Sequence, residues 1–160
     1  MIHIHVYEKW WIGLTTIMLV VLAVLVGVAG FVNGFQLPQP FARIDPNTVK
    51  ASGPFSEAEL GLRELAPGKY EAHILAQASP WRYYPSEITV PVGSTVTFYV
   101  TSADVQHGFK VQDTNINMMV LPGQIAKLTR TFDKAGEFPY VCTEYCGVGH
   151  QNMFGKIIVK

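Results

Sequence analysis

The sequence has no excess of charge of either sign. Its 160 residues carry 12 basic and 12 acidic side chains, and charged residues make up only 15% of the chain. Because nucleic acids and other polyanions are bound through clusters of basic residues, we expect no nucleic-acid partner. The sequence also lacks internal repeats and low-complexity tracts, which argues against a repeat architecture. A chain of this length allows one sizeable domain with an appendage.

Cysteine is also scarce, because the chain contains only Cys142 and Cys146. Two cysteines in an oxidising compartment form a disulfide by default, and a structural disulfide is one interpretation of this pair. The segment 142–153 favours another, since it has the spacing Cys-x3-Cys-x3-His-x2-Met and adds His150 and Met153. Thiolate, imidazole and thioether groups are ligands that suit copper. The segment therefore predicts a copper-binding loop.

The glycines at 147 and 149 let this loop double back, so that Cys146, His150 and Met153 surround one centre. One thiolate, one histidine and a weak methionine ligand would describe a mononuclear blue-copper site, once a second histidine came from elsewhere in the chain. A membrane-anchored mononuclear copper electron carrier is therefore one candidate function. A non-enzymatic copper-delivery protein is another.

Cys142 is an additional ligand that a mononuclear site does not need. Two thiolates on one loop can both bridge two coppers, and each copper then needs one imidazole and one weak outer ligand. We expect the second imidazole from His107, which lies between two strand-like runs. Glu144 lies between the cysteines, where its backbone carbonyl can be the second weak ligand. The loop thus predicts a binuclear site.

Charged residues are absent from residues 10–42, and residues 12–32 form a nearly continuous apolar run. At 1.5 Å per residue, about 21 residues give a helix of about 30 Å, enough to cross the hydrocarbon core of a membrane. We therefore expect one transmembrane helix over residues 10–33, with tryptophans at its start. A cleaved secretory signal is the alternative, because residues 26–29 include small residues suitable for cleavage, but the apolar run exceeds the usual signal core.

The positive charge of Lys9 favours a cytoplasmic location for the N-terminal arm, residues 1–9. The rest of the chain after the helix would then lie on the opposite side of the membrane. We expect a single-pass protein of the inner (plasma) membrane with its copper domain on the periplasmic or extracellular side. Residues 34–68 contain five prolines and no sustained period, so they predict an extended linker. Its one expected helical turn covers residues 56–65.

Residues 69–160 change to a strand-like period. Many short strands within about 90 residues imply an all-β antiparallel sandwich or barrel. The segments expected as strands are 70–76, 88–91, 95–101, 109–111, 116–121, 125–132, 137–142 and 156–159.

Several motifs together resemble subunit II of cytochrome c oxidase, the subunit that holds the binuclear CuA centre. They are the copper loop, the upstream Asp-Val-Gln-His at 104–107, Asn-Ile-Asn at 115–117, Leu-Pro-Gly at 121–123 and Arg-Ile-Asp-Pro at 43–46. The resemblance covers most of the chain and is closest to the branch with one transmembrane helix, the b/a-haem oxidases. Every position of the family's ligand motif is filled.

The resemblance implies a fold and a set of ligands. The fold is a cupredoxin-like Greek-key sandwich or barrel preceded by one transmembrane helix. Two cysteines would bridge the coppers, two histidines would cap them, and a methionine and a backbone carbonyl would be axial. The residues at these positions are Cys142, Cys146, His107, His150, Met153 and Glu144. In many relatives the carboxylate at the Glu144 position also reaches a Mg²⁺ at the interface with subunit I, and a hydrogen-bond acceptor is the alternative.

Two further groups of residues have open interpretations. By resemblance, Trp81, Tyr83 and Tyr84 lie near the copper on the surface where cytochrome c docks, and core packing is the alternative. Asp104 either orients a group next to the metal ligands or caps a turn.

The implied function is the electron-accepting subunit of a respiratory terminal oxidase. Cytochrome c would reduce the copper centre, which would pass electrons to haem in subunit I, where oxygen is reduced to water. Subunit I and cytochrome c are the expected partners, with a small accessory subunit as a further one. A nitric-oxide reductase with the same copper module is the alternative enzyme, whereas a quinol oxidase subunit would lack the ligands.

Overall fold

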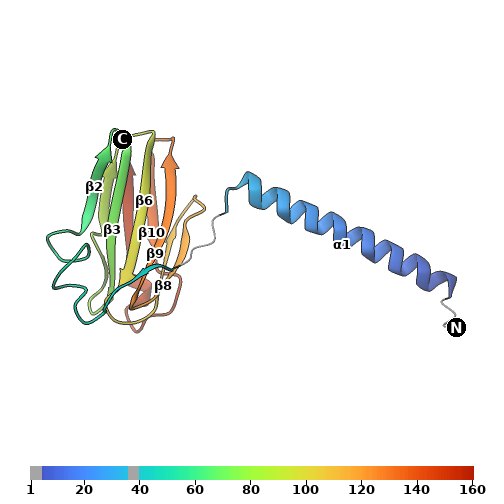
Figure 1. Ribbon diagram of the computed structural model, residues 1–160, viewed down its shortest axis with the longest axis horizontal. Helices are drawn as coiled ribbons and strands as arrows, with labels where there is room; N and C mark the ends of the chain where they lie inside the picture. Colours follow the sequence, from blue (N-terminus) through green and yellow to red (C-terminus); the bar gives the residue numbers. More distant parts are fainter. Residues whose placement is uncertain (1–4, 36–39) are drawn as a thin grey trace. The chain divides into compact units, whose positions relative to one another are not determined.

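The computed structural model describes residues 5–35 and 40–160, and Figure 1 shows its elements. The chain divides into two compact units, Met1–Phe35 and Gln36–Lys160. Parts of the expected N-terminal arm (1–4) and of the expected linker (36–39) lie outside the described residues.

The first unit is the helix α1, Val6–Val32. Its 27 residues give a length of about 40 Å, which exceeds the hydrocarbon thickness of a membrane. It begins four residues before the expected start at residue 10, because the His5 side chain accepts a hydrogen bond from the Tyr7 backbone N–H and caps the helix. The helix contains no buried residue. Among the described residues it is the one helix long and apolar enough to span a membrane.

The second unit is a sandwich of two β-sheets (Figure 1). The six-stranded sheet has the order β1-β9-β6-β3-β2, with β4 paired to β3, and the five-stranded sheet has the order β5-β11-β10-β7-β8. The strands are β1 (Pro40–Arg43), β2 (Gly61–Ala66), β3 (Lys69–Ala78), β4 (Trp81–Tyr84), β5 (Glu87–Val90), β6 (Ser94–Ser102), β7 (His107–Val111), β8 (Asn117–Val120), β9 (Gln124–Phe132), β10 (Gly136–Val141) and β11 (Phe154–Val159).

The expected all-β sandwich with one N-terminal helix is confirmed, and each expected strand is present with bounds shifted by a few residues. The sandwich is not purely antiparallel, however, because β3 pairs with β6 and β5 pairs with β11 in parallel. Crossing connections between the sheets produce these pairs. Between the sheets lies one apolar core, whose alternating inward residues include Phe98, Phe109 and Tyr140.

The segment expected to be an extended linker contributes two strands to the sandwich. β1 pairs with β9 and β2 pairs with β3, so their backbone groups are satisfied by sheet hydrogen bonds. The expected helical turn over 56–65 is present only at its start, where the Leu60 N–H donates to the Ser56 carbonyl at 3.0 Å. It does not continue to residue 65, because Gly61 has a φ of 111° that is incompatible with a helix and begins strand β2. The compact unit therefore begins well before residue 69.

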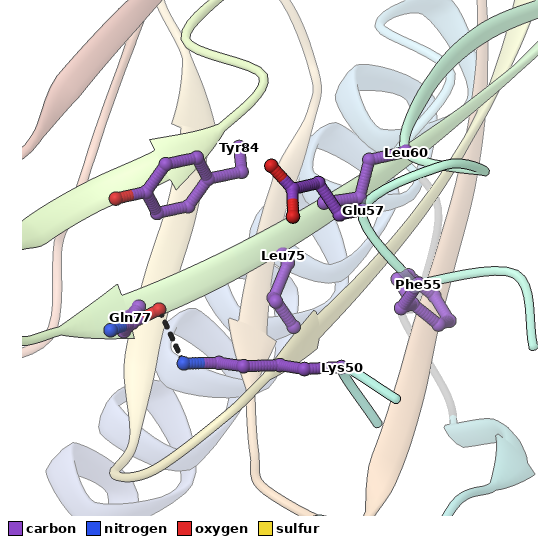
Figure 2. Close-up of a pocket in the computed structure, with 7 residues that line it drawn as sticks. All are labelled: Lys50, Phe55, Glu57, Leu60, Leu75, Gln77 and Tyr84. Atoms are coloured by element: carbon purple, nitrogen blue, oxygen red, sulfur yellow. Dashed lines mark hydrogen bonds between the residues drawn. The ribbon is translucent and has the colours of Figure 1, made fainter. Parts of the chain in front are cut away.

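The turns between β1 and β2 cover the outer face of the six-stranded sheet. Val49 and Phe55 from these turns are buried against Leu75 of β3 and Ile125 of β9, which forms a second, smaller core. Beside it is a pocket of about 260 Å³, shown in Figure 2. Its lining residues are Lys50, Phe55, Glu57, Leu60, Leu75, Gln77 and Tyr84, and the Lys50 ammonium donates to Gln77 Oε1 at 2.6 Å.

Candidate metal centre

The copper loop expected from the sequence connects β10 to β11 in the five-stranded sheet. β10 pairs with β11 on one side and with β7 on the other, which places the start of β7 beside the loop. His107 is the first residue of β7 and is completely buried. Two segments separated by more than 30 residues therefore meet at one end of the sheet.

The donor atoms of the loop and of His107 lie in two groups, one around each cysteine sulfur. The Sγ atoms of Cys142 and Cys146 are 3.8 Å apart. Cys142 Sγ is 3.9 Å from His107 Nδ1 and 3.2 Å from the backbone carbonyl of Glu144. Cys146 Sγ is 3.5 Å from His150 Nδ1 and 3.8 Å from Met153 Sδ. Each sulfur thus has its own imidazole nitrogen and its own weak donor.

The two cysteines do not form the disulfide that was the alternative interpretation. Both are free and buried. Their sulfur separation of 3.8 Å is far longer than the roughly 2.05 Å of a disulfide bond.

Electrostatics at the two sulfurs favour a bound cation. Burial opposes ionisation of Cys142, but hydrogen bonds from His107 and from the Gly108 N–H outweigh it and lower the pKa of this thiol. Burial and the nearby charge of Cys142 raise the pKa of Cys146. Two thiolates at this distance repel each other in the absence of a positive charge. A metal ion in contact with both sulfurs removes this repulsion.

The donor set fits copper. His107 and the two cysteines offer ligand atoms that all lie within 4.8 Å of one another. Soft sulfur and imidazole donors are the types that select copper, and each sulfur has one imidazole and one weak donor beside it, a carbonyl oxygen for Cys142 and a thioether for Cys146. The residues expected as ligands are therefore all brought together.

Asp104 is held beside the first histidine. Its carboxylate is 3.0 Å from His107 Nε2 and accepts hydrogen bonds from the backbone N–H groups of Ala78 and Val105, each at 2.7 Å. Because Nε2 is engaged by the carboxylate, Nδ1 of the same ring is left to face Cys142. Asp104 therefore contacts His107 and also accepts hydrogen bonds from the backbone of the neighbouring turns, which is compatible with both interpretations from the sequence.

Trp81 packs against the ligand loop. Its Nε1–H donates to the Cys146 carbonyl at 3.3 Å. A Cβ at Gly149 would lie 2.4 Å from the indole ring. Gly147 has the positive φ of 126° expected for a loop that doubles back, but Gly149 has a φ of −94°. Gly149 is thus required for the close approach of Trp81 rather than for a turn.

The other two aromatic residues of β4 do not lie on a docking surface beside the loop. Tyr83 is completely buried in the core between the sheets, so the expectation that it contacts cytochrome c is wrong. Tyr84 points to the opposite face of the strand and lines the pocket in Figure 2. Alternation along the strand places Tyr84 on the face opposite Trp81 and Tyr83, and no strand was expected over these residues.

The Glu144 side chain is partly exposed and accepts a hydrogen bond from Gln106 Nε2 at 3.3 Å. Its backbone carbonyl, and not its carboxylate, faces Cys142. The backbone carbonyl of Glu144 therefore faces the metal centre, whereas its carboxylate contacts Gln106, the residue before His107.

Gly108 is a residue of the site that sequence reasoning missed. Its backbone N–H donates to Cys142 Sγ at 3.4 Å. A glycine inside a strand often marks the close approach of another backbone, and this signal was available in the sequence directly after His107.

A family model, a curated relative and a solved structure point to the same family. The sequence model of the family described as cytochrome C oxidase subunit II, periplasmic domain, matches residues 76–160. A cytochrome c oxidase subunit 2 of Thermus thermophilus is 40% identical over 156 residues, which cover 96% of this chain and 92% of that relative. A chain of a solved heme-copper terminal oxidase dimer has a TM-score of 0.76 at 34% identity and covers 96% of this chain and 99% of its own length.

The periplasmic domain of subunit II of the cytochrome oxidase of Bradyrhizobium japonicum has the same fold, with a TM-score of 0.51 at 23% identity over 56% of this chain and 83% of that domain. The cupredoxin-like architecture implied by the resemblance is thus confirmed, and the N-terminal apolar helix fits a membrane-anchored protein. The chain belongs to the cytochrome c oxidase subunit II family and is a subunit of a heme-copper oxidase that partners other oxidase subunits.

Proposed function

We propose that this chain is the electron-accepting subunit of its oxidase and that its metal centre holds two coppers. The observation that carries the proposal is the pair of sulfurs 3.8 Å apart, each with its own histidine nitrogen and weak donor. When bound, two copper ions joined by both thiolates would accept and release one electron with the charge shared over both ions. A mononuclear carrier would leave Cys142 without a role.

The residues of the chain keep the donors in place during electron transfer. Cys142, Cys146 and His107 are buried, and the loop that carries two of them joins adjacent paired strands. Asp104 fixes His107, and Trp81 fixes the loop from the side of Cys146. A site that moves little between its two charge states has a low reorganisation cost, which suits rapid relay better than catalysis at the metal.

Cytochrome c is the proposed donor, and it would dock on the exposed side of the ligand loop. Tyr145 and Val148 of this loop are 78% and 82% exposed, and Trp81 lies beside the same loop. Exposed apolar groups around a redox centre are typical of an interaction surface. We propose docking that is mainly apolar, because residues 69–160 contain nearly equal numbers of basic and acidic side chains.

The remaining partners follow from the same assignment. Electrons would pass to haem in subunit I, where oxygen would be reduced to water, and a small accessory subunit would complete the complex. Lys9 favours a cytoplasmic N-terminus and a β domain on the periplasmic or extracellular side of the inner membrane. Glu144 would supply a carboxylate oxygen for Mg²⁺ at the interface with subunit I.

Electron acceptance can be measured directly by mixing the copper-loaded chain in detergent with reduced cytochrome c under anaerobic conditions. We expect oxidation of the cytochrome together with reduction of the copper centre. Trp81→Leu removes the indole ring that lies beside the ligand loop, so we expect the second-order rate of cytochrome c oxidation to fall by at least about tenfold. The measurement is stopped-flow absorbance.

Phe41→Leu is the matched control, because Phe41 is an exposed aromatic residue on β1. Its rate is expected to equal that of the unaltered chain. If cytochrome c does not reduce the copper-loaded chain, the proposed donor is wrong. If both variants slow equally, the docking surface does not include Trp81.

A further inference from the structure

We propose that Tyr83 is a positioning residue of the metal centre, which holds Gly108 so that its N–H donates to the Cys142 sulfur. The inference rests on the proposed function, because it concerns the electronic state of a copper-bound thiolate. It differs from the docking role expected from the sequence, since Tyr83 would act from inside the core.

Tyr83 is fixed in one orientation by neighbouring rings. It packs edge-on against Phe109 and Tyr140, with ring centroids 5.6 and 5.3 Å apart. Its side chain is completely buried, and its hydroxyl donates to the backbone carbonyl of Gly108. A buried hydroxyl with a fixed ring is a rigid donor. It constrains the backbone at Gly108, where glycine itself has little torsional preference.

The Gly108 N–H is the second half of this connection. In an extended strand, the N–H and C=O of one residue point to the same side, so a bond at the carbonyl also directs the N–H. The N–H is 3.4 Å from Cys142 Sγ, a sulfur that also faces His107 Nδ1. Tyr83, Gly108 and Cys142 therefore form one connected path from the core to the metal centre.

The absence of a side chain at Gly108 is necessary for this contact. A Cβ there would lie 2.1 Å from Thr143 Oγ1, 2.7 Å from the Thr143 backbone nitrogen and 3.0 Å from the Glu144 nitrogen. Two of these atoms belong to the backbone, so the ligand loop itself would have to move. Only glycine lets β7 approach the loop closely enough for an N–H to reach the sulfur.

A hydrogen bond to a thiolate withdraws electron density from the sulfur. The bond is stronger when the sulfur carries more negative charge, which is the case when the centre is reduced. Hydrogen bonds to ligand sulfurs are a recognised means of setting reduction potentials. The arrangement therefore favours the reduced form of the centre, and loss of the Tyr83 hydroxyl would favour the oxidised form.

The test compares Tyr83→Phe with the unaltered full chain, both loaded with copper in detergent. At a fixed ambient potential we expect the ratio of oxidised to reduced centre to rise about fivefold, the effect of one ordinary hydrogen bond. Redox titration followed by visible absorbance measures this ratio. In the metal-free chain, the Gly108 amide should also exchange its hydrogen faster, which nuclear magnetic resonance can follow after labelling glycine with ¹⁵N.

Tyr140→Phe is the matched control. Tyr140 is also completely buried and belongs to the same aromatic cluster, but its hydroxyl donates to the Pro85 carbonyl at 2.8 Å, away from the ligand loop. For this variant we expect the ratio of oxidised to reduced centre, and the hydrogen-exchange rate of the Gly108 amide, to match those of the unaltered chain. Equal ratios in the two tyrosine variants would overturn the inference.

Gly108→Ala provides an independent arm if Tyr83→Phe does not fold. It moves the loop away from β7, so the ratio of oxidised to reduced centre should rise as well. An unchanged ratio in Gly108→Ala would also overturn the inference. Failure of the proposed function would be seen separately, as fewer than two coppers in the unaltered chain.

Discussion

Cys142→Ser is expected to reduce the copper content of the chain from two ions to at most one. Cys142 is one of the two sulfurs that both ions would share, and it lies between His107 Nδ1 and the Glu144 carbonyl. A serine hydroxyl is a hard, protonated donor at neutral pH and does not replace a soft bridging thiolate. Cys146, His150 and Met153 would remain together as a set for one copper.

Metal analysis of the purified variant, together with its electron paramagnetic resonance spectrum, measures this effect. Gln151→Ala is the control, because Gln151 is an exposed residue of the same loop and is not one of the donors. The control should keep two coppers. If Cys142→Ser kept two coppers with an unchanged spectrum, the assignment of the bridging ligands would be wrong.

Asp104→Asn is expected to weaken copper binding by about 10- to 100-fold, the usual effect of losing a partner that orients a metal ligand. The carboxylate faces three nitrogen groups, His107 Nε2 and the N–H groups of Ala78 and Val105. An amide has only one acceptor oxygen, so its NH₂ group must face at least one of these donors. The orientation of His107 is then lost or strained.

Competition with a copper chelator measures the affinity, and thermal unfolding of the metal-free variant shows whether the fold is preserved. Asp113→Asn is the control, because Asp113 is exposed and has a positive φ of 56° that asparagine also tolerates. Equal affinities in both variants would show that Asp104 has no role in holding His107.

The proposed donor groups of the site could be picked out in the sequence because most of them are local. Four side-chain donors lie within residues 142–153, and their spacing alone indicated copper chemistry. His107 required an argument from the number of imidazoles needed, and strand pairing between β7 and β10 is what brings it to the loop. Gly108 signalled a close approach of some other backbone, but the pairing that makes the ligand loop its neighbour was not visible in the sequence, so Cys142 could not be named as its partner.

The segment between the helix and residue 69 shows where local patterns failed. Five prolines and a capping pattern suggested a linker with one helical turn, but β1 and β2 gain sheet hydrogen bonds from distant strands. Phe55 is buried because it packs against apolar side chains on the outer face of the six-stranded sheet, which come from strands distant in sequence. Likewise, whether Tyr83 faces the core or solvent depends on the register of β4 against β3, which no short pattern fixes.

Copper stoichiometry combined with electron paramagnetic resonance of the unaltered full chain tests the central claim most directly. The chain would be loaded with copper in detergent under oxidising conditions. The account predicts two coppers per chain that share one unpaired electron, with more hyperfine lines than one copper nucleus can give. One copper per chain with a single-nucleus pattern would contradict it and would indicate a mononuclear carrier.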